Sequence, residues 1–369
     1  MKVRTKFYVL IVQFVVIWGF SYALSESVGL VDVYGIRFYP MVQTLRHSVF
    51  GVVPFSVGDV LYFMAGGWLV LTVVRWIQYV RKRNECKELL KGSVMNAANV
   101  LLLVYVLFLV GWGANYNKPP LAETWALKEV KYSNDAAQKE AYVKDLKWFA
   151  RFLADSLNRY AAEYRQLTYE ELNKRAVGYY GEYTQSKVQQ SGLGVKKSMY
   201  GSLIQRMAVD GYYNPFTGEG QIAASVPMFM MPFTLCHEMA HQAGIAAEGD
   251  ANLLAYAIGT TTTNATFRYS AYLNLWLYAS RRLYYVDSTV AKEIGVRLPE
   301  LTKAHIDTLE QLSKRYDGLL TRFTGTIYDS YLKSQHQQKG IRSYGNVLRE
   351  AMLLEEKRGK GDVQTIELL

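Results

Sequence analysis

Two histidines and a glutamate lie close together in the run His237-Glu238-Met239-Ala240-His241. Histidines four residues apart lie on one face of a helix, one turn apart, where both imidazoles can bind a single metal ion. Zinc lowers the pKa of a bound water molecule to about 7, and Glu238 is placed to take the proton from that water. The spacing therefore predicts a zinc site with His237 and His241 as ligands and Glu238 as the catalytic base.

The residues around this motif favour a helix with defined ends. Pro232 suits a first helical turn and Gly244 suits the position after the last turn, which predicts a helix of about 12 residues. Leu235, Met239 and Ala240 make this helix largely apolar, so paired histidines beside a glutamate would be costly to bury without a function. The alternative is a helix with incidental polar residues.

A catalytic zinc site needs a third protein ligand and keeps one position open for water. Glu248 is the first candidate, because Gly244 allows a sharp turn that returns the chain to the metal. Its alternative role is a carboxylate favoured by the dipole at the start of a helix. Asp250 is the rival ligand, although it points in a nearly opposite direction on the same helix. Asn252 lies one turn after Glu248, where we expect its side chain to hydrogen-bond His237 or another ligand.

Peptide hydrolysis also requires a group that stabilises the negative charge developing on the carbonyl oxygen. Arg268, Tyr269 and Tyr272 lie on the next predicted helix and are candidates for this role. Packing is their alternative role, since the chain contains 29 tyrosines. Residues 221–226 are predicted to form a short strand that either pairs with an extended peptide at a sheet edge or simply connects other elements.

Three long apolar runs precede residue 113 and predict transmembrane helices at about 7–24, 60–80 and 97–112. Lysines and arginines cluster before the first run and between the second and third, and with two nearby glutamates they contribute +7 of the formal net charge of +10. Because such clusters mark the cytoplasmic side, residues 1–112 are predicted to be a membrane anchor and residues 113–369 an extracytoplasmic domain. The alternatives are a signal peptide for the first run and a buried core helix for one of the three.

This distribution of charge also bears on possible partners. Beyond the anchor the chain is nearly balanced in charge and lacks a basic stripe with interleaved aromatic residues, so no nucleic-acid partner is expected. Cys86 and Cys236 are predicted to lie on opposite sides of the membrane, so no disulfide is expected between them. Cys236 adjoins a predicted ligand, but neighbours on a helix point about 100° apart. We therefore interpret Cys236 as a packing residue.

The domain after residue 112 is predicted to be predominantly helical with a small β element. Apolar residues recur at three- and four-residue spacing over residues 135–165, 298–333 and 341–357. The run Thr168-Tyr-Glu-Glu171 matches the capping signal at the start of another helix. A helical domain that carries this motif would be a zincin-like metallopeptidase domain.

Several runs of the sequence resemble a bacterial family of unknown function, the one numbered 3810. These runs are Asn214-Pro-Phe-Thr-Gly-Glu, Pro232-Phe-Thr-Leu-Cys-His-Glu-Met-Ala-His-Gln, Glu248-Gly-Asp-Ala-Asn-Leu-Leu-Ala-Tyr, Phe267-Arg-Tyr-Ser-Ala-Tyr-Leu and the stretch from Tyr331 to Tyr344. The resemblance covers nearly the whole chain. The family is regarded as membrane-anchored zinc metallopeptidases, which implies zinc at His237 and His241 with Glu238 as the base.

The resemblance also bears on the third ligand and on the location. The family commonly has an Arg-Glu-Asp-Glu-Ala-Asn run, where this chain has Ala-Glu-Gly-Asp-Ala-Asn over residues 247–252. Glu248 keeps its place while the second glutamate has become Asp250, which favours Glu248 as the ligand. A bacterial family implies the cytoplasmic (inner) membrane, crossed several times.

These observations predict a mainly α protein in which three transmembrane helices precede a zinc-dependent peptidase domain. Its partners would be the lipid bilayer and a peptide or protein substrate. The alternative is a catalytically silent zinc-binding protein that acts as a membrane sensor or an envelope assembly factor. A metal-independent membrane scaffold is the third hypothesis.

Overall fold

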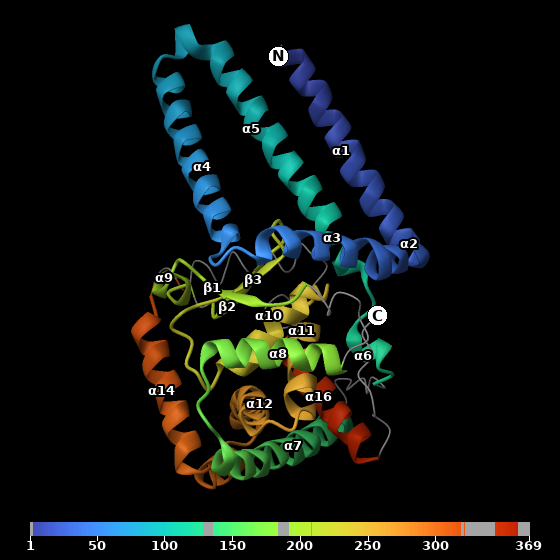
Figure 1. Ribbon diagram of the computed structural model, residues 1–369, viewed down its shortest axis with the longest axis vertical. Helices are drawn as coiled ribbons and strands as arrows, with labels where there is room; N and C mark the ends of the chain where they lie inside the picture. The colour runs from blue at the N-terminus through green and yellow to red at the C-terminus, as the bar shows by residue number, and fades with distance from the viewer. Residues whose placement is uncertain are drawn as a thin grey trace. The chain divides into compact units, whose positions relative to one another are not determined.

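The computed structural model describes residues 3–127, 136–183, 192–207, 209–318, 321 and 344–360. Within these residues the protein is mainly helical, with one three-stranded sheet (Figure 1). The chain divides into two compact units. We call Met1–Lys118 with Asn214–Glu219 the membrane unit, and Pro119–Tyr213 with Gly220–Leu369 the helical unit.

Three helices of the membrane unit are long and apolar enough to cross a membrane. They are α1 (Val3–Glu26), α4 (Val57–Arg81) and residues Glu85–Gly111 of α5 (Arg83–Gly111). The first two contain the predicted spans 7–24 and 60–80 and extend beyond them, because the flanking polar residues continue the helix. The third begins well before the predicted span 97–112 and ends at Gly111, one residue before the end of that span. Only 6%, 17% and 17% of their most apolar windows is buried inside the protein. Their apolar side chains therefore need another apolar surrounding, which a lipid bilayer supplies.

The segment between α1 and α4 is almost continuously helical. It consists of α2 (Val28–Val33), the π-helical η1 (Tyr34–Phe38), α3 (Tyr39–Arg46) and the π-helical η2 (His47–Gly51). In Figure 1 this segment crosses one end of the three long helices, and the short 3-10 helix η3 (Gly113–Asn117) follows α5 at the same end.

The two basic clusters meet at the opposite end of the membrane unit. The Nζ atom of Lys6, near the start of α1, donates a hydrogen bond of 3.1 Å to the carbonyl oxygen of Gly92, in the first part of α5. Asn99, also on α5, donates to the carbonyl oxygen of Lys6 at 3.1 Å. These bonds hold the start of α1 beside the first turns of α5, so both clusters lie on the same side of the spans.

The helical unit contains the other helices and the sheet, except for Asn214 at the end of β2 and Glu219 at the start of β3, which belong to the membrane unit. Its elements are α6 (Leu121–Thr124), α7 (Ala136–Glu163), α8 (Tyr169–Tyr183), β1 (Val195–Lys197), α9 (Ser202–Gln205), β2 (Gly211–Asn214), β3 (Glu219–Ile222), α10 (Met231–Gln242), α11 (Glu248–Thr261), α12 (Ala265–Val286), α13 (Ser288–Val296), α14 (Glu300–Tyr316) and α16 (Tyr344–Gly359). Of the predicted helices, residues 135, 319, 320, 322–333 and 341–343 lie outside the described part of the chain.

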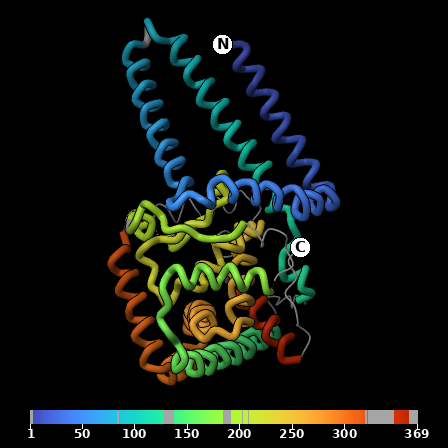
Figure 2. The backbone as a smooth tube through the Cα atoms, viewed as in Figure 1, coloured from blue at the N-terminus to red at the C-terminus, as the bar shows by residue number. Residues whose placement is uncertain are grey.

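The core of the helical unit is built around α12. This helix packs against α7, α10, α11, α13 and α16, and Figure 2 shows it nearly end-on. Tyr269 and Phe267 of α12, Tyr256 of α11 and Phe149 of α7 are among the largest fully buried side chains. The helix that carries the His-Glu-x-x-His motif, α10, and the next helix, α11, are thus held by a continuous apolar core.

The predicted capping signal of α8 is confirmed. The Thr168 N–H donates to Oε2 of Glu171 at 2.9 Å, and the Glu171 N–H donates to Oγ1 of Thr168 at 3.3 Å. This reciprocal pair satisfies two amides that a helix start would otherwise leave free.

The sheet has the strand order β1-β3-β2, and β1 pairs with β3 in parallel, with Val195 opposite Gly220. The Ala223 N–H donates to the Asp210 carbonyl oxygen at 2.8 Å, which closes the far end of the β2–β3 hairpin. Within the described sheet, β3 is therefore the central strand. Of the two roles predicted for residues 221–226, the sheet edge is wrong, because only residues 221 and 222 lie in a strand and that strand, β3, has β1 and β2 on its two sides. The connecting role agrees with this order, and β1 and β2 are the edges of the described sheet.

Candidate metal centre

The α10 helix, which carries the motif, is buried along almost its whole length. Pro232 lies in its first turn, where the missing N–H has no helical partner to lose. The Phe233 N–H donates to Oγ of Ser270 at 3.2 Å, which satisfies another amide at this end. Gly244 has a φ of +85°, a left-handed conformation that suits glycine. The helix therefore ends there and the chain turns back toward α11.

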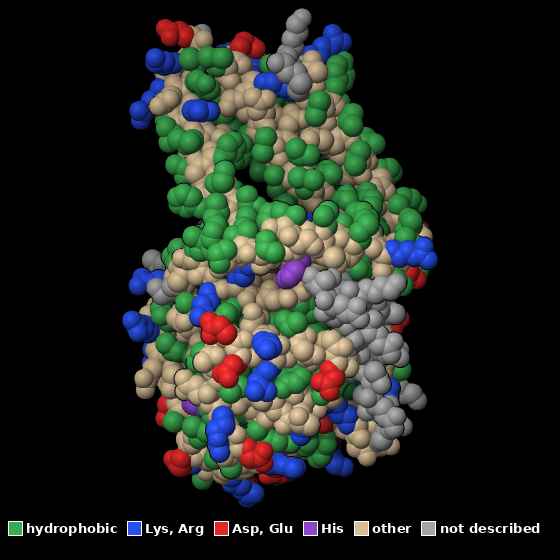
Figure 3. All heavy atoms as spheres, in the orientation of Figure 1, with side chains coloured by type: hydrophobic (Ala, Val, Ile, Leu, Met, Phe, Trp, Pro, Cys, Tyr) green, Lys and Arg blue, Asp and Glu red, His purple; other side chains and the backbone are tan. Residues whose placement is uncertain are grey.

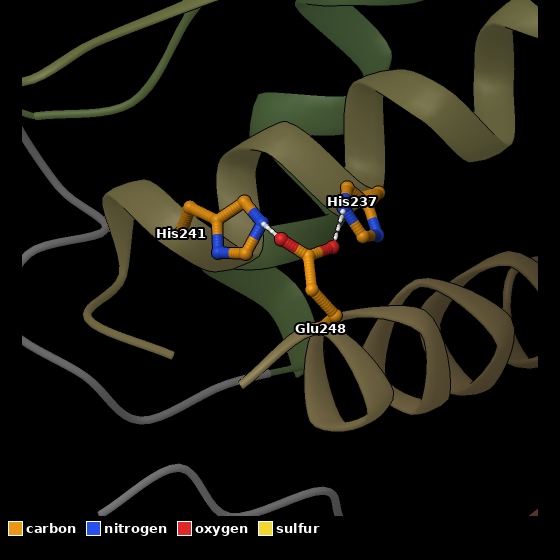
Figure 4. Close-up of side chains that lie close together, drawn as sticks. All are labelled: His237, His241 and Glu248. Atoms are coloured by element: carbon orange, nitrogen blue, oxygen red, sulfur yellow. Dashed lines mark ion pairs between the residues drawn. The ribbon is translucent and has the colours of Figure 1, made fainter. Parts of the chain in front are cut away.

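His237, His241 and Glu248 converge at one point (Figure 4), with one ligand atom from each within 4.8 Å of the others. The Nε2 atom of His237 lies 3.2 Å from Oε2 of Glu248, and Nε2 of His241 lies 3.6 Å from Oε1. The three side chains keep 14%, 6% and 13% of their surface exposed, so the cluster is enclosed but reachable. Two imidazoles and a carboxylate are a ligand set of catalytic zinc.

The histidines are oriented by groups behind them. The Nδ1 atom of His241 lies 2.7 Å from the carbonyl oxygen of Ile245. A proton on Nδ1 makes this hydrogen bond and leaves the lone pair on Nε2, the atom that faces Glu248, where it can coordinate a cation. The side chain of Asn252 hydrogen-bonds His237. Because Asn252 is on α11 with Glu248, that helix supplies both a cluster carboxylate and a support for one imidazole.

Glu248 acts unequally on the two imidazoles. Burial alone would lower the pKa of His237, but the hydrogen bond and charge of Glu248 raise it above its ordinary value. Burial does lower the pKa of His241, whose distance to Glu248 is longer. His241 is therefore held in the neutral form that metal ligation requires.

Glu238 is buried beside the cluster, with 2% of its surface exposed. Its Oε2 atom has no hydrogen-bond partner among the described residues. Burial raises the pKa of Glu238 to about 8; Glu248 and Asp210 add to the rise and His237 opposes it. An unpaired buried carboxylate is costly, and a cation held by the cluster would stabilise its ionised form. The residues present therefore fit a bound metal ion.

The sheet confines Glu238 from the other side. A Cβ atom at Gly220 would lie 3.3 Å from Cβ of Glu238, and one at Gly211 would lie still closer to its carboxylate. Glycine at both positions lets β2 and β3 approach α10. The strands thus limit where this carboxylate can lie.

Asp250, the rival ligand, does not join the cluster. Its carboxylate accepts a hydrogen bond from the backbone of Leu121, at the start of α6, and burial raises its pKa to about 6. The turn after Gly244 directs Glu248 toward the histidines, so Asp250, two residues later, points elsewhere. Of the carboxylates of Glu248 and Asp250, only that of Glu248 lies beside His237 and His241.

The three candidates for oxyanion stabilisation contact other groups. The guanidinium of Arg268 donates to the Tyr160 hydroxyl, and the ring of Tyr272 stacks on Tyr160 with centroids 5.7 Å apart. The Tyr269 hydroxyl lies 2.8 Å from Nδ1 of His305. None of these described contacts reaches the cluster. They indicate packing and anchoring roles for Arg268, Tyr269 and Tyr272.

Two residues that sequence reasoning missed lie beside the motif. The ring of Tyr213 on β2 has its centroid 6.4 Å from that of His241. Gln242 donates from Nε2 to the Gly194 carbonyl oxygen at 3.0 Å, and its Oε1 accepts from the Gly194 N–H at 3.1 Å. This amide pair ties the end of α10 to the start of β1. In the sequence, only the position of Gln242 directly after His241 could have pointed to this residue.

The fold and the cluster define a mainly helical, membrane-associated protein with a site that could hold a metal ion. The chain matches a family described as "Protein of unknown function (DUF3810)" over residues 34–352. This match covers most of the chain, so the protein belongs to that family, which confirms the resemblance. No curated protein and no solved structure matches the chain.

Proposed function

We propose that this protein is a membrane-anchored zinc peptidase with a zincin-like helical domain. The observation that carries the proposal is the convergence of His237, His241 and Glu248 beside the buried carboxylate of Glu238. This ligand set, on a helix with the His-Glu-x-x-His pattern, is suited to catalytic zinc and leaves a position open for water.

Each residue of the cluster and its surroundings would have a distinct role in hydrolysis. When bound, zinc would lower the pKa of a coordinated water molecule to about 7. Glu238 would accept the proton of that water and later pass it to the leaving amine. Ile245 and Asn252 would hold the two imidazoles in place through their hydrogen bonds. The close approach of the sheet would keep the Glu238 carboxylate from turning away.

The position of β2 favours a peptide as the substrate. It is an edge of the described sheet, and Tyr213 on this strand lies near His241. An extended peptide that pairs with β2 through backbone hydrogen bonds would pass along the cluster. A backbone-paired peptide also needs no particular side chains to be held.

The two basic clusters at one end of the membrane unit support the proposed location. Their common side would be the cytoplasm, because lysines and arginines concentrate there. Three spans then carry the chain after Lys118 to the extracytoplasmic side. In a bacterium the peptidase domain would then lie outside the cytoplasmic membrane.

The test is the Glu238→Gln variant of the full chain in lipid nanodiscs, with Glu310→Gln, an exposed glutamate of α14, as the matched control. Metal analysis should find zinc in the wild type and in both variants. Cleavage of a fluorogenic peptide library should fall by about 10²- to 10⁴-fold in Glu238→Gln only. Unchanged cleavage in Glu238→Gln would refute the mechanism.

The second candidate is a zinc-binding sensor or assembly factor without peptidase activity. The low exposure of the three ligand side chains, between 6% and 14%, favours it, because a structural metal needs no substrate access. Zinc bound by the full chain with no cleavage across the library would support this function. Absence of any bound metal would instead favour a membrane scaffold.

A further inference from the structure

The helical segment between α1 and α4 exposes an apolar face. Large hydrophobic side chains recur along it, each between 52% and 79% exposed: Val33, Ile36, Met41, Leu45, Val49 and Val52. Soluble surfaces rarely expose a contiguous apolar patch of this kind unless it binds something. We therefore expect this apolar face to be covered by a binding partner.

The opposite face of the segment is already occupied within the membrane unit. Tyr39 and Gln43 are fully buried. The Nε2 atom of Gln43 donates to the Gly218 carbonyl oxygen at 2.8 Å, in the residues 214–219 that belong to this unit. The ammonium group of Lys118 lies 5.5 Å from the centre of the Tyr39 ring. These contacts fix the rotation of the segment, so its apolar face is held outward.

The segment lies where all three candidate spans end. It begins directly after α1, and it leads to Ser56, the N-cap of α4. The Nη1 atom of Arg46 donates to the carbonyl oxygen of Gly111, the last residue of α5, at 3.0 Å. Trp112 and Tyr116 follow at once, with ring centroids 5.3 Å apart. Trp112 is buried and Tyr116 is half-buried, so this pair packs within the unit at the end of α5.

We propose that residues 28–55 form an interfacial helix that lies in the bilayer surface, with its apolar side chains among the upper parts of the acyl chains. Lipid is the occupant because the exposed side chains of the spans continue onto this segment, as Figure 3 shows for one face. An amphipathic helix in this position buries its apolar face at the boundary between headgroups and acyl chains. This inference is independent of the peptidase function.

The test uses the full chain, reconstituted in phosphatidylcholine vesicles, with single cysteines that carry an environment-sensitive fluorophore. Cys86→Ser removes one native thiol, and Cys236 is fully buried and stays unlabelled. Labels are placed at Met41→Cys and Leu45→Cys. Leu103→Cys on α5 is the control for the bilayer interior, and Thr308→Cys on α14 is the control for water; both side chains are exposed.

Labels at positions 41 and 45 should be quenched roughly twofold more by lipids with a spin label near the headgroup than by lipids with one near the chain end. Position 103 should show the reverse, and position 308 should respond only to aqueous iodide. Iodide quenching at 41 and 45 equal to that at 308 would overturn the proposal. Protection from both lipid labels and iodide would also overturn it, since a second copy or another protein would then cover the face.

Discussion

Gly211 of β2 lies directly against the carboxylate of Glu238 on α10. A Cβ atom at Gly211 would lie 2.5 Å from Oε1 of Glu238 and 2.9 Å from the carbonyl oxygen of Gln221. The first atom ends a buried side chain with little room to move, and the second belongs to the backbone of β3. The presence of glycine at position 211 therefore decides where the proposed base can lie.

Replacing Gly211 by alanine should displace the Glu238 carboxylate. We expect peptide cleavage to fall by about 100-fold, because a shift of about 1 Å at a reacting group has that effect. Zinc content should not change, since the three ligands are untouched. Gly178→Ala on α8 is the control: a Cβ atom there meets no atom within 4 Å. It should keep full activity and stabilise the helix by about 0.5–1 kcal/mol.

The two carboxylates of α11 should differ in their effect on metal binding. Glu248→Ala removes a cluster ligand and should weaken zinc binding by more than about 100-fold, beyond the usual effect of an outer-shell residue. Asp250→Asn should leave zinc affinity unchanged, because Asp250 contacts the backbone of Leu121 instead. Isothermal titration of the metal-free full chain with zinc measures both. Equal losses in the two variants would contradict the geometry.

Asn252→Ala should weaken zinc binding by about 10- to 100-fold, the range for residues that orient a ligand. The reason is that Asn252 hydrogen-bonds His237, so its loss lets the imidazole rotate. The same zinc titration measures the effect. Asn252→Asp, which keeps an accepting oxygen, should recover most of the affinity; failure to recover would indicate a packing role.

His305 should make stability depend on pH. Its ring stacks on Phe229 with centroids 3.8 Å apart, and burial lowers its pKa below the ordinary 6.5. The unfolded chain then binds more protons in mild acid. The stability that the neutral ring contributes is complete above about pH 6.5 and is lost as the pH falls through the lowered pKa. Melting temperature measured against pH should decline less steeply below pH 6.5 in His305→Phe, and identical slopes would contradict this assignment.

Arg358 should be needed to hold α16 against α11. Its guanidinium donates to Glu355 at 2.7 Å, to Thr260 at 2.7 Å and to Thr261 at 2.8 Å. Arg358→Ala leaves a Glu355 carboxylate only 10% exposed without its counterion, which costs about 3–5 kcal/mol. Thermal melting of the full chain should show this loss.

The control for Arg358 is another ion pair at the end of α16, between Glu356 of this helix and Lys360 just after it. Lys360 and Glu356 form a pair at 2.7 Å with 64% and 57% of their side chains exposed. Lys360→Ala should cost less than about 1 kcal/mol. A comparable drop in melting temperature for both variants would show that the buried ion pair of Arg358 stabilises the protein no more than the exposed pair of Lys360.

Local sequence was enough to predict several elements. The apolar runs indicated the three candidate spans, and Thr168 with Glu171 marked the start of α8. Pro232 and Gly244 delimited the motif helix within one or two residues. Each of these features depends on residues that are neighbours in the chain, so periodicity and capping chemistry reveal them.

Local sequence also determined that His237 and His241 share a helical face, because their spacing equals about one turn. Only the tertiary structure decided that Glu248, and not Asp250, meets them, because the direction of α11 after Gly244 depends on how that helix packs. The same packing placed Arg268, Tyr269 and Tyr272 in other contacts and made β3 a central strand. Helix packing and strand order arise between residues far apart in sequence, so no local pattern records them.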